Sequence, residues 1–168
     1  MGETILDVRG LCVSYRSDGG FVDAVRNVSF ALGRERLGIV GESGSGKSTI
    51  GRALLRLLPT ARVTAQALRF EELDLLSLSE RQMLDVRGRR MSMILQDPKF
   101  SLNPVRRVGD QVAEAWLAHV RGARAEARRR TLEMLEAVQI RDPERVYNLY
   151  PHEISGGMGQ RVMIAMML

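Results

Sequence analysis

The chain has 168 residues, a length that favours a single domain, and its 27% charged and 45% hydrophobic residues are typical of a globular protein. No apolar run approaches the roughly 20 residues that cross a bilayer, and the first residues lack the pattern of a signal peptide, so we expect a cytosolic protein. The sole cysteine, Cys12, excludes an internal disulfide and a cysteine-held metal cluster. The net charge of +5 comes mainly from arginine, since Lys47 and Lys99 are the only lysines.

A basic excess can indicate a nucleic-acid partner. The densest basic cluster, however, lies on an expected helix with glutamates among the arginines, as in Arg128, Arg129 and Arg130 beside Glu126 and Glu133. This mixture favours a solvated helix face, and we expect no nucleic acid as a partner.

The first third of the chain predicts strands around a glycine-rich loop. Alternating apolar residues predict strands over 5–15 and 21–32, and the short apolar run 37–40 predicts a buried parallel strand. A Gly/Ser loop over 41–46 follows, and apolar residues at helical spacing predict a helix that ends at Pro59.

The remainder predicts mostly helices. Residues 62–76 are expected to be extended and then turn-like, Ser79 is expected to cap a short helix, and 91–95 to form a second buried strand. Two helices are predicted over 108–120 and 123–138, with a break at Asp142-Pro143, a loop over 152–157 and a third helix from Met158. This order predicts an α/β core with a helical subdomain.

The glycine-rich loop matches the phosphate-binding pattern G-x-x-x-x-G-K-[ST]. The matching residues are Gly41, Glu42, Ser43, Gly44, Ser45, Gly46, Lys47, Ser48 and Thr49. Glycines let backbone N–H groups approach phosphate oxygens, Lys47 can reach the β- and γ-phosphates, and the Ser48 hydroxyl can ligate Mg²⁺. The following helix directs its positive N-terminal end at the phosphates.

Two further motifs follow the loop. Gln96 lies at the end of the second predicted buried strand, where a glutamine can ligate Mg²⁺ and position an attacking water, although a plain polar loop residue is the default for this signal alone. Ser155, Gly156 and Gly157 lie at the start of a helix, where N–H groups and a hydroxyl converge on an anion. Without the phosphate loop, an ordinary capped helix would be the better interpretation.

Together the three motifs resemble those of ABC-type nucleotide-binding domains in order and spacing. The closer resemblance is to ATPase subunits of oligopeptide, dipeptide and nickel importers, and it runs from about residue 5 to the last residue. The stretches that carry it are 41–49, Gln96-Asp97-Pro98 with 101–104, 150–153 and 155–166. The resemblance implies an α/β P-loop NTPase fold with an N-terminal antiparallel β region, an ATP-binding core over 1–104 and a helical signature subdomain over 105–168.

The resemblance also implies roles for single residues. Tyr15 would stack on the adenine of ATP, the phosphate loop would hold the phosphates, and Lys47 and Gln96 would take part in catalysis. Ser48 and Gln96 would ligate Mg²⁺. Ser155, Gly156 and Gly157 would close on ATP held by a second, identical or related, ATPase subunit. The segment from Pro98 to Pro104 would contact an integral membrane permease subunit, which would place the chain at the cytoplasmic face of the inner membrane as a peripheral subunit.

The function implied is that of an energy-coupling ATPase subunit of an importer of peptides or similar solutes. The family continues beyond its signature helix with an acidic strand end, a catalytic glutamate and a switch histidine, whereas this sequence stops at Leu168. His119 and His152 precede the signature, so neither can be the switch histidine. We therefore expect this chain alone to bind nucleotide at best and to hydrolyse it very slowly or not at all.

Three alternatives belong to other classes. The first is a non-hydrolysing nucleotide-binding or interaction module, which ATP turnover would distinguish from a transport ATPase. The second is an ABC ATPase of DNA repair or translation, which the Gln96-Asp97-Pro98 and Tyr150–Glu153 contexts disfavour. The third is a small P-loop kinase, in which the Ser155 motif would have no role.

Overall fold

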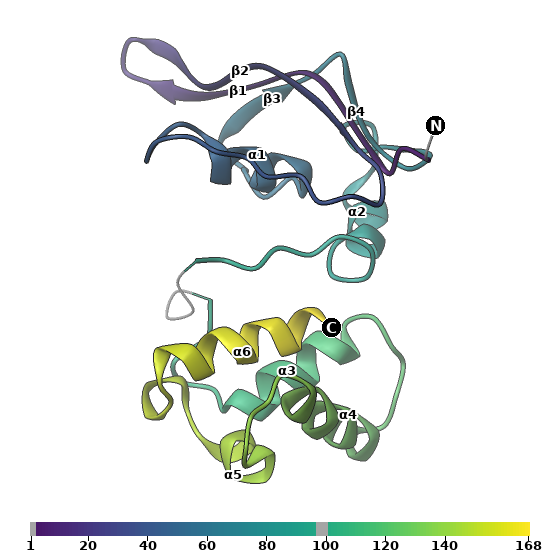
Figure 1. The fold of residues 1–168 in the computed structure, drawn as a ribbon, viewed down its shortest axis with the longest axis vertical. Helices are drawn as coiled ribbons and strands as arrows, with labels where there is room; N and C mark the ends of the chain where they lie inside the picture. Colours follow the sequence, from purple (N-terminus) through teal and green to yellow (C-terminus); the bar gives the residue numbers. More distant parts are fainter. Residues whose placement is uncertain (1–2, 97–100) are drawn as a thin grey trace. The chain divides into compact units, whose positions relative to one another are not determined.

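The chain divides into two compact units, residues 1–87 and 88–168, in a computed structural model that describes residues 3–96 and 101–168. Figure 1 shows the strands in the first unit and most of the helices in the second. This division by packing falls after Arg87. The predicted functional division at residue 104, drawn to keep the Gln96 segment with the ATP-binding core, stays a prediction.

The first unit is built on an antiparallel sheet whose central strand is β1 (Leu6–Ser17). One edge of β1 pairs with β2 (Gly20–Leu32). The other edge pairs with β4 (Ala67–Phe70) along the first part of β1 and with β3 (Ala61–Thr64) along its later part. The short β5 (Leu73–Asp74) extends the sheet beyond β4. The predicted N-terminal antiparallel region is thus confirmed.

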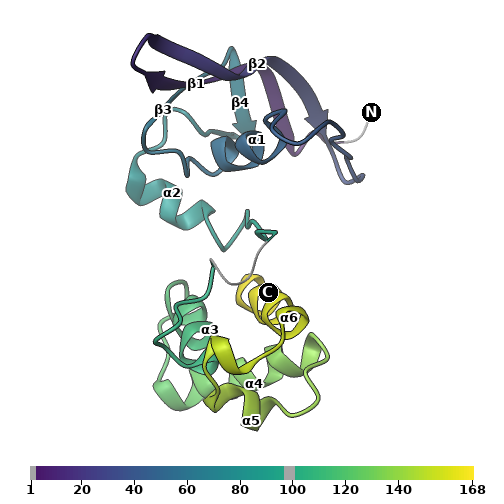
Figure 2. The same cartoon turned by 90° about the vertical axis from the view of Figure 1, so that its left-hand side faces the viewer.

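Two helices complete the first unit. Helix α1 (Lys47–Leu54) lies against the sheet in the two perpendicular views of Figures 1 and 2, and it buries Ile50 and Ala53. Ser79 caps helix α2 (Glu80–Val86), as the sequence predicts, and the structure adds a capping box in which the Ser79 side chain accepts a hydrogen bond from the N–H of Gln82. The apolar core of the unit joins both helices to the sheet. Its buried residues are Leu6, Val8, Leu11, Val13, Val25, Ile50, Ala53, Leu55, Leu68, Phe70, Leu75, Met83 and Val86.

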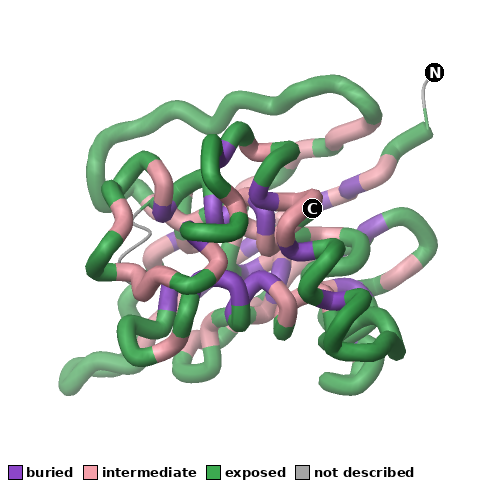
Figure 3. The backbone as a smooth tube through the Cα atoms, turned by 90° about the horizontal axis from the view of Figure 1, so that it is seen from below, coloured by how far each residue is buried: buried purple, intermediate pink, exposed green. Residues whose placement is uncertain are grey.

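The second unit packs four α-helices around one core. They are α3 (Val108–Leu117), α4 (Arg124–Ala137), α5 (Pro143–Asn148) and α6 (Gly156–Met167), with a short 3-10 helix over Pro151–Glu153 before α6. Helix α3 contacts the other three. The buried residues of this core are Leu102, Val108, Val112, Leu135, Ile140, Val146, Val162 and Ala165. Figure 3 shows that buried stretches alternate with exposed ones along the chain and that the long loops are largely exposed.

The sequence predicts a break at Asp142-Pro143, whereas the structure has the helix α5 there. Proline is well tolerated at the first position of a helix, where its missing N–H would have no partner. Asp142 caps this helix by accepting a hydrogen bond from the N–H of Arg145 at 3.2 Å. The break in the helical pattern is therefore also the start of the next helix.

Two predictions, a buried parallel strand over 37–40 and a second buried strand over 91–95, were wrong for this structure. Neither segment forms a strand in the part of the chain that the structure describes. The apolar side chains of 37–40 are exposed, with Val40 at 96%, whereas in 91–95 Ile94 is 49% exposed and the other apolar side chains are half-buried. A buried parallel strand needs a neighbouring strand to satisfy its backbone hydrogen bonds and cover on both faces. Within the described ranges the sheet pairs only β1 to β5, all antiparallel, so neither segment belongs to it.

The surface of α4 carries the predicted mixture of charges. Glu133 forms ion pairs with Arg129 at 2.5 Å and Arg130 at 3.0 Å, and Arg128 pairs with Glu144 of α5. The basic cluster on α4 is therefore a solvated, internally paired helix face. Over residues 3–96 and 101–168, the helices are too short or too polar for any one of them to cross a membrane.

Candidate nucleotide site

The phosphate loop turns tightly between two glycines with positive φ. Gly44 has φ +82° and Gly46 has φ +90°, a backbone region that glycine enters at little cost. A Cβ on Gly46 would lie 2.5 Å from the carbonyl oxygen of Ala24 in β2, so the loop packs directly on the sheet backbone there. The sheet thereby fixes the point at which the loop enters α1.

Lys47 is the first residue of α1, and its ammonium group lies against the loop. Its Nζ donates to the carbonyl oxygens of Gly41 at 2.8 Å and Glu42 at 2.6 Å, and to Ser45 Oγ at 3.3 Å. The only cation of the 41–49 segment is thus held at the mouth of the loop. This is the position from which a lysine can reach bound phosphates.

The N-terminus of α1 is open. Its N-cap residue is Gly46, no described side chain bonds to its first N–H groups, and its first turn contains no acidic residue among those described. The other end is held, because Arg87 donates from Nε to the Leu55 carbonyl at 2.7 Å and from a terminal nitrogen to the Arg56 carbonyl at 3.2 Å. Both arrangements suit the helix dipole, which favours an anion at the N-terminus and a cation at the C-terminus.

The residue predicted to contact the adenine, Tyr15, can be placed in this unit. Tyr15 lies half-buried on β1, two residues after Val13, which pairs with Val25. The side chain of Val25 would in turn lie 3.1 Å from a Cβ on Gly46, so Tyr15 belongs to the part of the sheet that adjoins the loop. Its stacking on a base stays a prediction.

The donors for Mg²⁺ are few. Among the described residues no three histidines, cysteines or acidic side chains gather where they could hold a metal ion. Ser48 is exposed in the first turn of α1, beside the open N–H groups. Gln96 is exposed in the second unit, and Asp97 and Pro98 lie outside the described residues, so the role of this segment stays a prediction.

The Ser155 motif forms a capped helix start in the second unit. Ser155 is the N-cap of α6, and its hydroxyl accepts a hydrogen bond from the Met158 N–H at 3.3 Å. Gly156 and Gly157 are exposed, and a Cβ on either would meet no atom within 4 Å among the described residues. This turn is therefore accessible to another molecule, although one of its N–H groups already has a partner.

A cavity of about 490 Å³ adjoins the Ser155 turn. It joins that turn to the segment predicted to contact a permease and to the 150–153 stretch. Its lining consists of Leu102, Pro104, Pro151, His152, Ile154, Ser155, Gly156 and Gly159. The His152 ring stacks on Tyr150, with ring centres 5.7 Å apart.

Gln111, which the sequence did not single out, fixes one wall of this cavity. The side chain is 5% exposed and makes three hydrogen bonds to backbone, with the Asn103 N–H at 2.8 Å and with the Asn103 and Arg106 carbonyls at 3.0 Å each. A glutamine on an apolar helix face was the available signal. Gln111 therefore holds the loop that carries Leu102 and Pro104.

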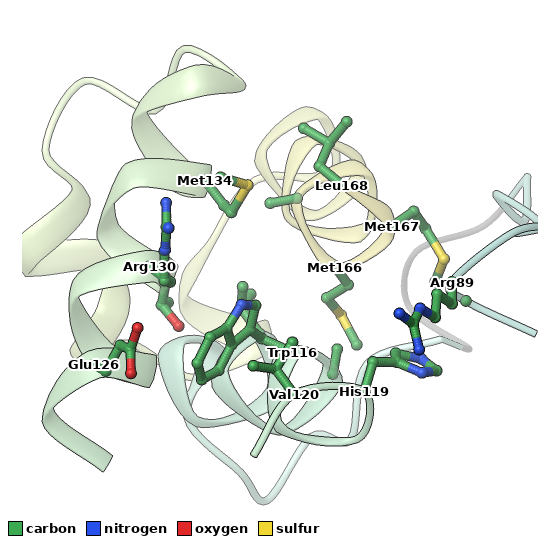
Figure 4. A pocket seen from close by; sticks show the side chains of 15 residues that line it. Arg89, Trp116, His119, Val120, Glu126, Arg130, Met134, Met166, Met167 and Leu168 are labelled. Carbon is green, nitrogen blue, oxygen red and sulfur yellow. The ribbon is translucent and has the colours of Figure 1, made fainter. Parts of the chain in front are cut away.

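A second cavity, of about 500 Å³, lies near the C-terminal end of α6 (Figure 4). Figure 4 shows Trp116 and His119 from α3 and the turn after it, Met134 from α4 and Met166 from α6. The buried Thr131 also lines this cavity, and its hydroxyl has no hydrogen-bond partner among the described residues. The lining includes none of the predicted site residues, so this cavity is separate from the Ser155 turn.

Comparisons with known proteins give consistent matches. The family model described as "ABC transporter" matches residues 25–168. The chain is 52% identical to a probable peptide ABC transporter ATP-binding protein of Sinorhizobium fredii, over 99% of this chain and 50% of that protein. It is 46% identical to the oligopeptide transport ATP-binding protein OppD of Bacillus subtilis, over 98% of this chain and 47% of that protein. The chain thus spans about half the length of the curated relatives it matches.

Solved structures agree with these matches. A dimeric bacterial ABC transporter cassette, and a dimeric ATP-binding cassette bound to ADP and Pi in a post-hydrolysis state, each superpose with a TM-score of 0.78 at 26% identity. Each alignment covers 97% of this chain and 68% of the solved one. The arrangement within the two units is therefore that of a known fold.

Proposed function

This chain belongs to the ABC transporter family, and from that premise we propose that it is the ATP-binding, energy-coupling part of an importer for peptides or similar solutes. One observation carries the proposal: the Lys47 ammonium is held at the mouth of a loop that ends in an open helix N-terminus. A cation, free N–H groups and a helix dipole that converge on one point are suited to bind phosphate groups. The names of the relatives support the peptide-like solute.

ATP fits this site by the chemistry of its donors. Residues 41–49 would hold the phosphates, with Lys47 on the β- and γ-phosphates and the N–H groups of the first turn of α1 on the remaining oxygens. Tyr15 would lie on the adenine. Bound Mg²⁺ would neutralise charge on the phosphates, and the Ser48 hydroxyl and Gln96 are the residues we propose to hold it.

Two features of the second unit support the proposed partners. We propose that Ser155, Gly156 and Gly157 contact ATP bound to a second ATPase subunit, and that the wall held by Gln111 contacts a permease subunit. These partners would keep the chain at the cytoplasmic face of a membrane. The family hydrolyses ATP, which requires a group that activates water. No Asp or Glu follows Glu153 in the 168 residues, so we propose that this chain alone binds ATP with very slow or no turnover.

Binding and turnover of Mg-ATP by the purified chain, beside Lys47→Ala, test the proposal. We expect saturable binding in the unchanged chain, weakened about 10- to 100-fold in Lys47→Ala, because charged hydrogen bonds to phosphate are lost. We expect no phosphate release above background from either protein. Equal affinity in the two proteins would contradict the nucleotide site. Lys47-dependent hydrolysis would instead contradict only the proposed lack of turnover.

A further inference from the structure

We propose that Ser45 is a positioning residue for Lys47, and that a side chain at position 41 would displace the Ser45 hydroxyl from the lysine. The inference deepens the proposed nucleotide site and rests on it. It concerns three residues of the loop, namely Gly41, Ser45 and Lys47. It assigns the first glycine of the motif a different physical role from the other two.

The Lys47 ammonium has three N–H bonds and three acceptors. Two acceptors are backbone carbonyls, of Gly41 and Glu42, which persist whatever side chains those positions carry. The third, Ser45 Oγ at 3.3 Å, is the only side chain that bonds to Nζ among the described residues. Since a flexible four-carbon stem can point the ammonium in many directions, the third contact limits Lys47 to the mouth of the loop. A substitution at Ser45 therefore removes the side-chain contact that orients Lys47.

The physical reason for a glycine at position 41 differs from the reason at positions 44 and 46. Gly44 and Gly46 have positive φ, which disfavours any side chain by conformation, whereas Gly41 does not belong to the positive-φ residues of the described chain. A Cβ on Gly41 would instead lie 2.6 Å from Ser45 Oγ, a distance too short for those two atoms. The same Cβ would lie 3.4 Å from Ser45 Cβ and 3.9 Å from Lys47 Cδ, both tolerable contacts. The conflict at position 41 is thus with one hydroxyl oxygen.

A double-mutant cycle tests this coupling through the affinity for Mg-ATP. Gly41→Ala is expected to weaken binding about tenfold, because the displaced hydroxyl can no longer hold Lys47 and the loop is overpacked. Ser45→Ala is expected to weaken it about threefold, through the lost hydrogen bond alone. The double variant is expected to match Ser45→Ala, because the added methyl group no longer meets an oxygen. The proposal would be overturned if the fold-loss of affinity in the double variant equalled the product of the two single losses.

The chain offers matched controls for each change. Gly19→Ala also adds a methyl group to a glycine without positive φ, but its Cβ would meet no described atom within 4 Å. Ser77→Ala also removes an exposed hydroxyl that makes one hydrogen bond, to the Asp74 carbonyl at 3.0 Å. Both controls are expected to bind Mg-ATP as the unchanged chain does. Melting curves of every variant would separate lost folding from lost affinity.

A second measurement tests the contact without nucleotide. Lys47 and Lys99 are the only lysines, so limited acetylation followed by peptide mass spectrometry reports the reactivity of Lys47 with Lys99 as an internal reference. Ser45→Ala and Gly41→Ala are each expected to raise the relative reactivity of Lys47 about threefold, since an amine with fewer hydrogen bonds is freer to react. Ser45→Thr, which keeps the hydroxyl, is expected to restore the original value.

The two measurements distinguish the inference from the proposed function. If the unchanged chain binds no nucleotide but Ser45→Ala still raises the reactivity of Lys47, then the function is wrong and the positioning role stands. If the chain binds Mg-ATP and neither the reactivity nor the double-mutant cycle shows coupling, the positioning role is wrong and the function stands.

Discussion

The two units each present a helix N-terminus to solvent, and the two N-termini are built differently. In α1 the N-cap is Gly46, whose missing side chain leaves the first N–H groups open beside a cation, Lys47. In α6 the N-cap is Ser155, whose hydroxyl already bonds to one N–H group, and the first turn carries no cation in the described residues. The N-terminus of α1 is suited to bind phosphate without help from another molecule. The N-terminus of α6 is suited to contribute to a site that another molecule forms.

The packing around the two N-termini also differs, because α1 is closely packed and the first turn of α6 is not. A Cβ on Gly46 would conflict with the backbone of β2, and Arg87 holds the far end of α1. No described atom lies within 4 Å of a Cβ placed on Gly156 or Gly157. Helix α1 is therefore fixed before a ligand arrives, while the α6 turn has room for a partner to approach.

The largest effect is expected from Lys47→Arg, which tests whether charge alone makes the first N-terminus a site. A guanidinium is a planar group that cannot place three N–H bonds on the acceptors of one ammonium. Affinity for Mg-ATP, measured by calorimetry, is expected to fall about tenfold or more. The matched control is Arg62→Lys, an exposed change on β3. Unchanged affinity in Lys47→Arg would mean that the geometry around Nζ is unimportant.

Gly46→Ala tests whether the sheet fixes the entry into α1. The new methyl group would meet the Ala24 carbonyl at 2.5 Å, and alanine is strained at φ +90°. We expect a loss of about 1–3 kcal/mol in the free energy of unfolding, measured by urea denaturation. Hydrogen exchange should locate the loss in residues 1–87. A loss confined to residues 88–168 would contradict the account of α1.

Thr131→Val tests whether the second unit has stability of its own. The Thr131 hydroxyl is buried without a hydrogen-bond partner among the described residues, so replacing it by a methyl group removes a desolvation cost. We expect the unfolding free energy to rise by about 1 kcal/mol. Hydrogen exchange should slow in α4 and leave α1 unchanged. A fall in stability would show that the hydroxyl has a partner.

Ser155→Ala tests the cap that distinguishes α6 from α1. Loss of the hydrogen bond to the Met158 N–H is expected to cost about 1 kcal/mol, as for other serine caps. Faster exchange of the amides in the first turn of α6 would report it, with the exposed Ser92→Ala as the matched serine change. Ser155→Asp should restore the protection, since aspartate also caps helices. If Ser155→Asp does not restore the protection, the Ser155 hydroxyl has a role other than capping α6.

The smallest effect is expected from the ion pairs on α4. Burial opposes the charge of Glu133, but hydrogen bonds and charge from Arg129 and Arg130 outweigh it and lower the pKa of this carboxyl. A lowered pKa in the folded state stabilises the fold above the ordinary glutamate pKa of 4.5, and this contribution disappears as the pH falls through the folded-state pKa. The melting temperature of Glu133→Gln should therefore lie slightly below that of the unchanged chain at pH 7 and converge with it in acid. A constant difference would contradict the ion-pair account.

Features that depend on residues close to one another in the sequence could be predicted. The loop, its lysine, the Ser79 and Ser155 helix starts and the first two strands all follow from local patterns, whereas the antiparallel arrangement was implied by the family resemblance. Contacts between distant residues could not be predicted, such as Arg87 on the Leu55 carbonyl or Gln111 on Asn103, because no local pattern specifies the partner. The strand over 37–40 failed for a related reason, since apolarity predicts burial but a strand also needs a neighbour.

Methionine is prominent along α6, where Met158 and Met166 pack against the core and Met163 is buried. Unbranched, polarisable side chains change rotamer easily and refill small gaps, unlike valine or isoleucine. The helix that begins at Ser155 can therefore shift by a fraction of a turn without opening a void beneath it. The same side chains make this helix vulnerable to oxidants, because a methionine sulfoxide would place a polar group in its packing surface.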